Sequence, residues 1–175
     1  ETFLLPVTWE NGWPIILENG AAVPTIAEKK GLQPCKNLLT GNFTYTDHFD
    51  SATLNNRWLF LRSPKGDSIR YCRQQHANFT AETELKANKV GGIILFQNEQ
   101  YNIIFTSMRV NGQPSLVLKR TEKGDEQQIT TRPIDITSEL KLKVEACGRY
   151  YSFYFLQGTA VWQTLATGVD GANLS

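Results

Sequence analysis

The sequence predicts an all-β fold, a two-sheet sandwich or a barrel of antiparallel strands, preceded by an extended connector. From Phe43 onward, short runs alternate apolar and polar residues and are bounded by Gly, Asn, Pro and Asp. The links between these runs contain the residues that tight turns require. No segment longer than about ten residues carries a helical stripe. At 175 residues the chain is long enough to bury one compact core.

The connector is predicted over residues 1–41, where Pro6, Pro14, Pro24 and Pro34 recur. Proline cannot donate a hydrogen bond in the interior of a sheet, so these residues argue against a central strand. The apolar content of this segment is too high for a solvated linker. We therefore expect residues 1–41 to lie against folded surface, part of it belonging to another domain, and residues 42–175 to form the β-domain.

Trp9 and Trp13 are the most conspicuous side chains of the connector. A proline-bounded segment has no core of its own in which to bury two indoles. Two interpretations are open: the tryptophans pack at the junction with a neighbouring domain, or they form a platform for a ligand.

Two segments predict half-buried strands by strict alternation. In residues 79–85, Phe79 and Leu85 share an apolar face that alternates with Glu82 and Glu84, and residues 140–146 alternate aliphatic with charged side chains. Further strands are expected over Gly92–Gln97, Tyr101–Ser107, Ser115–Thr121, Tyr150–Leu156 and Val161–Ala166.

Charge and hydropathy exclude several classes of function. Eighteen basic and seventeen acidic residues give a net charge of +1, and no basic patch with interleaved aromatics is present, so nucleic acid is not an expected partner. No window approaches about 18 consecutive apolar residues, so no membrane span is expected. The first residues lack the pattern of a signal peptide, so any export signal is expected outside this chain.

The three cysteines, Cys35, Cys72 and Cys147, are widely spaced, and none lies in a CxxC motif or near a histidine. This pattern predicts neither a disulfide framework nor a zinc site. We expect ordinary buried or half-buried thiols.

Four blocks of sequence, in order, resemble the C-terminal part of family 43 glycoside hydrolases of the β-xylosidase and α-arabinofuranosidase type. Leu5–Pro14 is similar to the segment that follows the catalytic five-bladed propeller of that family. Asp47–Asp50 with Arg57–Arg62, then Arg73–His76, then Gly91–Tyr101 resemble successive parts of its accessory sandwich. The resemblance implies a concanavalin A-like jelly roll, a two-sheet antiparallel β-sandwich.

The same resemblance implies that the catalytic carboxylates belong to a propeller upstream of everything in this chain. Two departures from the family pattern stand out. Only twelve residues separate Phe60 from Arg73, so either a loop is shorter here or residues are absent near Gly66–Ile69. Relatives also continue beyond the position of Ser175 into a strand whose loop supplies a pocket-closing aromatic, which cannot be assigned to any residue here.

Catalytic chemistry has no convincing candidates in the chain. Glu82 and Glu84 are spaced about 7 Å apart on one strand face, within the range that glycosidases use, but that face is expected to be solvated. His48 and His76 accompany no nucleophile motif. Asp47 and Asp50 are explained more simply by a turn than by calcium binding. We predict no catalytic residues, no metal and no cofactor.

Two polar or aromatic clusters remain as candidates for sugar or domain contact. Arg73, Gln75 and His76 are expected on a strand, either hydrogen-bonding beneath a sheet or facing sugar or a neighbouring domain. Tyr150 and Tyr154 share the face of their strand opposite to the buried one. A flat aromatic ring there is suited to stacking on a pyranose.

The sequence therefore favours a non-catalytic accessory sandwich that braces, and helps to shape the active site of, a propeller acting on xylan- or arabinose-type glycosides. The alternative is an autonomous carbohydrate-binding module, with xylo-oligosaccharide or arabinoxylan as its ligand. Location is left open between bacterial cytoplasm, periplasm and export.

Overall fold

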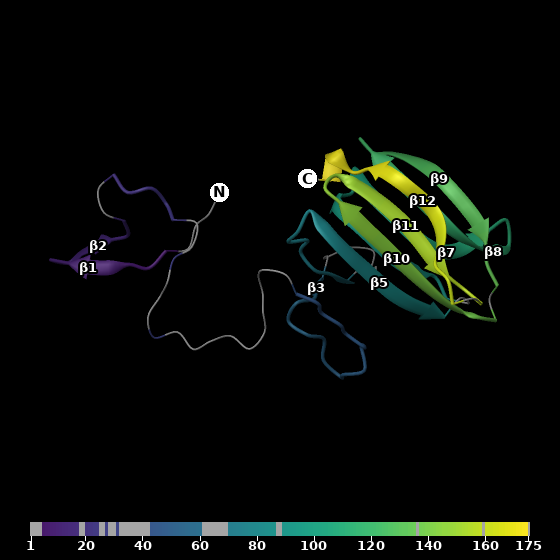
Figure 1. The fold of residues 1–175 in the computed structure, drawn as a ribbon, viewed down its shortest axis with the longest axis horizontal. Coiled ribbons are helices and arrows are strands. Elements are labelled where there is room, and N and C mark those ends of the chain that lie inside the picture. The colour runs from purple at the N-terminus through teal and green to yellow at the C-terminus, as the bar shows by residue number, and fades with distance from the viewer. Residues whose placement is uncertain are drawn as a thin grey trace. The chain divides into compact units, whose positions relative to one another are not determined.

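The computed structural model describes residues 5–17, 20–24, 27, 31, 43–60, 70–86, 89–135, 137–158 and 160–174 (Figure 1). Backbone contacts divide the chain into two units, residues 1–55 and 56–175. The predicted boundary at residues 41–42, Cys35 and the shortened link at Gly66–Ile69 lie outside the described residues.

The first unit contains a β-hairpin that the sequence did not lead us to expect. Strand β1 (Thr8–Glu10) pairs antiparallel with β2 (Trp13–Ile15). Between them, Asn11 and Gly12 both have positive φ, 50° and 83°, the conformation of a two-residue hairpin turn that Asn-Gly favours. Pro14 is tolerated because β2 is an edge strand of a two-stranded sheet. The segment for which the prolines predicted an extended connector thus contains two short paired strands.

The second unit contains two four-stranded antiparallel sheets. The first has the order β12-β11-β10-β5 and the second the order β6-β7-β8-β9. The strands of the first sheet are β5 (Asn78–Lys86), β10 (Glu139–Cys147), β11 (Tyr150–Leu156) and β12 (Gln163–Asp170). Those of the second are β6 (Gly91–Asn98), β7 (Tyr101–Val110), β8 (Gln113–Glu122) and β9 (Asp125–Pro133). A short pair, β3 (Leu59–Phe60) with β4 (Arg70–Tyr71), and a 3₁₀ helix η1 (Ala172–Leu174) complete the elements.

The chain crosses between the two sheets twice. After β5 it passes to the second sheet, runs through the four consecutive strands β6 to β9, and returns so that β10 pairs with β5. Tight turns join the consecutive strands, with positive φ at Asn111 and Gly112 and again at Lys123 and Gly124. The predicted all-β, two-sheet antiparallel sandwich is confirmed (Figure 1).

The core lies between the inner faces of the sheets. Residues Leu140, Leu142 and Val144 of β10 are fully buried, as their alternation with charged residues predicted. Phe153 of β11 meets Phe105 of β7 edge to face, with ring centroids 5.5 Å apart. Leu116 and Leu118 of β8 and Ile103 of β7 complete the second sheet's contribution to the cluster. The two layers are thus held by one continuous apolar cluster.

One open side of the sandwich is closed by polar contacts between edge strands. The Arg132 guanidinium of β9 donates to Gln163 Oε1 of β12 at 3.1 Å and lies 4.9 Å from the centroid of the Phe155 ring. Because Arg132 also covers a core aromatic, it contributes both a hydrogen bond and a cation–π contact at this edge.

Three sequence predictions about strands need correction. Strand β9 was missed because Asp125 to Gln128 show no alternation, as is usual for an edge strand that is mostly exposed. The last strand is Gln163–Asp170 rather than Val161–Ala166. Residues 73–76 form no strand; they lie between β4, which ends at Tyr71, and β5, which begins at Asn78.

Candidate functional site

The two tryptophans of the hairpin point to opposite sides of it. Trp9 is registered against Pro14, whereas Trp13 is registered against Glu10. Directly opposed residues of an antiparallel pair share a face, and adjacent pairs alternate between faces. Trp9 therefore lies on one face and Trp13 on the other, and each indole is 71% exposed.

The first unit exposes apolar surface well beyond these two rings. Eight of its described large hydrophobic residues are exposed: Val7, Trp9, Trp13, Ile15, Ile16, Val23, Tyr45 and Phe49. All the buried hydrophobic residues of the described chain belong to the second unit. So many exposed large hydrophobic residues in one small unit are typical of a surface that contacts another molecule or domain.

A turn in the first unit presents one of these aromatics. The Asp47 carboxylate accepts the Phe49 backbone N–H at 2.9 Å and the Tyr45 hydroxyl at 3.0 Å. Phe49 has a φ of 53°, which is unusual for a bulky residue, and is 54% exposed. Both carboxylate oxygens of Asp47 thus serve the turn, in agreement with the turn interpretation.

The outer face of the first sheet carries Tyr154 beneath a lysine. Lys143 Nζ lies 4.6 Å from the centroid of the Tyr154 ring and 4.9 Å from that of Trp162. The same ammonium contacts Glu145 Oε1 at 2.7 Å. Hydrogen bonding from Lys143 is the main cause that holds the pKa of Glu145 below its ordinary value, with a smaller contribution from Tyr154. The lysine therefore occupies one face of the Tyr154 ring.

Tyr150 is the first residue of β11 and is 48% exposed. The Arg149 guanidinium lies 5.0 Å from its ring centroid and forms an ion pair of 2.9 Å with Asp170. Of the two predicted tyrosines, Tyr150 is the more accessible, although a cation lies over one of its faces as well. Four residues of strand separate the rings by about 13 Å.

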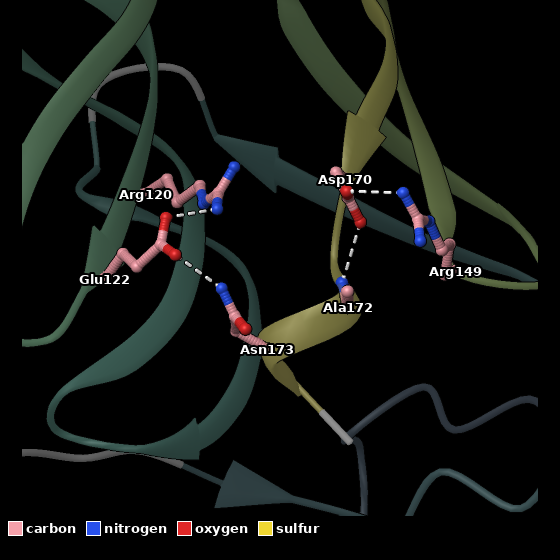
Figure 2. A network of polar contacts seen from close by, with 6 residues as sticks. All are labelled: Arg120, Glu122, Arg149, Asp170, Ala172 and Asn173. Atoms are coloured by element: carbon pink, nitrogen blue, oxygen red, sulfur yellow. Dashed lines mark hydrogen bonds and ion pairs between the residues drawn. The ribbon is translucent and has the colours of Figure 1, made fainter.

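A polar network joins the two sheets at this end of the sandwich (Figure 2). Asp170 accepts the Ala172 backbone N–H at 2.9 Å, and Asn173 of η1 donates to Glu122 of β8 at 2.5 Å. Glu122 also pairs with Arg120. The network fixes η1 between β12 of one sheet and β8 of the other. Sequence reasoning missed these residues because the bond between Asn173 and Glu122 spans 51 positions.

The predicted cluster before β5 is only partly surface. Arg73 and Gln75 are exposed, whereas His76 is half-buried with Nε2 buried. Gln74 donates to the His76 carbonyl at 2.9 Å, which closes a local turn. Asn78, two residues later, pairs with Cys147, and Cys147 pairs with Tyr150. The structure thus places this cluster and Tyr150 at one end of the first sheet.

The acidic pair on β5 is solvated, as expected. Glu82 and Glu84 share the exposed face of β5 with Thr80 and Lys86, and Glu84 forms an exposed ion pair of 3.0 Å with Lys141. Beside this pair, an open hollow of about 480 Å³ is lined by Ser138, Glu139, Lys141, Leu156, Gly158 and Ala160. Both carboxylates thus lie on a sheet face in contact with water, as the sequence predicted.

The described part of the chain bears on the predictions about metal ligands and cysteines. Within it, no group of three or more His, Cys, Asp or Glu residues is placed to hold a metal ion. Cys72 and Cys147 are exposed free thiols, so the expectation that they are buried or half-buried is wrong. Among the described residues, no helix is long and apolar enough to span a membrane.

Comparison with known proteins places this chain in a family and finds several similar proteins. Residues 66–175 match the family described as the β-xylosidase C-terminal concanavalin A-like domain. A non-reducing end α-L-arabinofuranosidase from Bacteroides ovatus is 25% identical over 193 residues, covering 87% of this chain and 34% of that protein.

Solved structures that share the fold include the following two. A xylan β-1,4-xylosidase from Bacillus halodurans superposes with a TM-score of 0.75 at 18% identity, covering 98% of this chain and 39% of that one. A subfamily 12 member of glycoside hydrolase family 43 from a capybara gut metagenome gives 0.74 at 26% identity, covering 97% and 39%. The chain thus spans little more than a third of the length of the proteins it matches.

Proposed function

Because this chain belongs to the family of β-xylosidase C-terminal concanavalin A-like domains, we propose that it braces the catalytic propeller of a family 43 glycoside hydrolase. In this role the sandwich takes no part in bond cleavage. It stabilises the propeller and helps to shape its substrate pocket.

The observation that carries this proposal is the contrast between the two units. The sandwich has a closed core built from both sheets, whereas the first unit exposes eight large hydrophobic residues. A buried aromatic side chain removes up to about 150–250 Å² of its surface from water, and the two exposed indoles lack most of this burial. A surface on the catalytic part would recover that burial and join the two bodies.

The substrate class follows from the relatives and not from this chain. The similar proteins are described as a xylan β-1,4-xylosidase and a non-reducing end α-L-arabinofuranosidase. We propose that the enzyme served by this domain hydrolyses xylan-type or arabinose-containing glycosides.

The test compares three forms of the enzyme: the propeller with residues 1–175, with residues 1–55 only, and alone. Loss of residues 56–175 is expected to lower both the Tm and the turnover of an aryl xyloside or arabinofuranoside. The middle form separates the contribution of the sandwich from that of the first unit. Unchanged Tm and turnover in all three forms would contradict a bracing role.

The alternative, an autonomous carbohydrate-binding module, has weaker support. Tyr150 is half-exposed, and a hollow lies beside Leu156. However, Lys143 lies over one face of the Tyr154 ring, and Arg149 lies over one face of the Tyr150 ring. A module of this kind predicts heat on titrating the isolated chain with xylohexaose or arabinoxylan, and loss of that heat in Tyr150→Ala. No heat across both ligands removes the alternative.

A further inference from the structure

The β1–β2 hairpin carries a large aromatic ring on each of its two faces, and this distinguishes it from a strand pair that lies on a protein surface. Trp9 and Pro14 form one face, and Trp13 and Ile15 lie on the other beside their partners Glu10 and Thr8. A hairpin packed on one side normally shows apolar residues on the buried face and polar residues on the face in water. Here each face carries an indole that is 71% exposed.

The turn makes this arrangement a fixed property of the hairpin. Asn11 and Gly12 adopt the paired positive φ values of a two-residue turn, and such a turn sets the register of its strands. A slip of one residue would move every side chain to the other face. The two indoles are therefore held on opposite sides whatever the hairpin contacts.

From this geometry we infer that both faces of the hairpin are contact faces, and that the hairpin inserts into the catalytic part of the enzyme rather than resting on it. An isolated two-stranded hairpin is at best marginally stable in water. Contact on both faces would stabilise it and bury both rings. This inference rests on the proposed function, because it takes the catalytic part as the occupant.

The sandwich of this chain already has a closed core, because its inner faces pack against each other around Phe105 and Phe153. The relatives, in contrast, have about three-fifths of their length outside the region that matches this chain.

The test measures the Tm of Trp9→Ala and Trp13→Ala in two settings, the whole enzyme and the isolated chain of residues 1–175. Each variant is expected to lower the Tm of the whole enzyme by about 2–4 °C. Neither is expected to change the Tm of the isolated chain. The matched control is Val161→Ala, whose side chain is also 71% exposed but lies on the sandwich, and which is expected to change neither Tm.

Two outcomes would overturn the inference. If only one tryptophan variant lowers the Tm of the whole enzyme, the hairpin is covered on one face only. If either variant lowers the Tm of the isolated chain by as much, the occupant is its own sandwich. If an alanine variant yields no folded enzyme, Trp9→Phe or Trp13→Phe replaces it, with a smaller fall expected. The bracing role itself is tested by a different experiment, the effect of deleting residues 56–175 on the Tm and turnover of the enzyme.

Discussion

The contact between Phe105 and Phe153 offers the sharpest test of how the two layers are joined. Phe153→Ala removes a fully buried ring from β11, and its partner Phe105 in the facing sheet is also fully buried. Truncating a buried Phe to Ala costs about 3–5 kcal/mol, and an edge-to-face pair contributes about 0.5–1.5 kcal/mol beyond the buried area. Against a domain stability of about 5–15 kcal/mol, the variant should retain the fold with little margin.

Urea unfolding of the isolated chain, followed by circular dichroism, measures this loss. With a slope of about 2 kcal/mol per molar urea, a loss of about 4 kcal/mol lowers the midpoint by about 2 M. Tyr150→Ala on the same strand is the control, because that ring is 48% exposed, and its midpoint should fall by about 0.5 M at most. Equal shifts for the two variants would refute the assignment of Phe153 to the core.

A double-mutant cycle isolates the contact itself. The combined Phe105→Ala and Phe153→Ala variant should lose less stability than the sum of the two single losses, because each single variant already removes the ring contact of 5.5 Å. Strict additivity would show that the sheets do not meet through these rings.

Three further predictions concern single positions in the sandwich. Gly92→Ala should destabilise the domain by about 1–3 kcal/mol in urea unfolding, because an added Cβ would lie 2.0 Å from the Phe105 carbonyl oxygen. Gly91→Ala is the control, and its destabilisation should be much smaller because the nearest atom to an added Cβ is Leu85 Cδ2 at 3.4 Å. Equal destabilisation by the two variants would contradict the strand geometry. Asn173→Ala removes the bond to Glu122 and should speed hydrogen exchange in η1 without moving the global midpoint by more than about 1 kcal/mol; unchanged exchange would contradict the role of Asn173. The pKa of Glu145 is lowered from 4.5 in the folded chain, so the contribution of this carboxylate to stability is present above pH 4.5 and is lost as pH falls through the lower folded pKa. Glu145→Gln should therefore weaken the dependence of the Tm on acid pH. An unchanged profile of Tm against pH would contradict the pairing of Glu145 with Lys143.

Strands with one buried face were the part of the fold that the sequence predicted well. The alternation in residues 79–85 and 140–146 was visible because one face of β5 and β10 packs on the core and the other meets water. Strand β9 has no such contrast, because most of its residues are exposed, so no alternation was available to find it.

The hairpin was missed for a different reason. Asn11-Gly12 is a strong hairpin signal, but the recurring prolines directed the prediction toward an extended connector. Edge strands accept proline, so Pro14 was compatible with β2 after all. The exposed tryptophans were identified from sequence, whereas their placement on opposite faces needed the register.

The polar contacts between strands could not be predicted from the sequence. The bonds of Asn173 to Glu122 and of Arg149 to Asp170 join residues that only the closed sandwich brings together. Lys143 over Tyr154 is of the same kind, because it depends on the registration of β10 against β11. Individual surface residues of these types are too common in sequences to indicate which of them will meet.

Hydrogen exchange of residues 5–17 tests the proposed docking of the first unit most directly. The exchange rates of these backbone amides are compared between the isolated chain and the whole enzyme. Docking of the hairpin against the catalytic part predicts fast exchange in the isolated chain and strong protection in the enzyme. Equal rates in the two settings would contradict it.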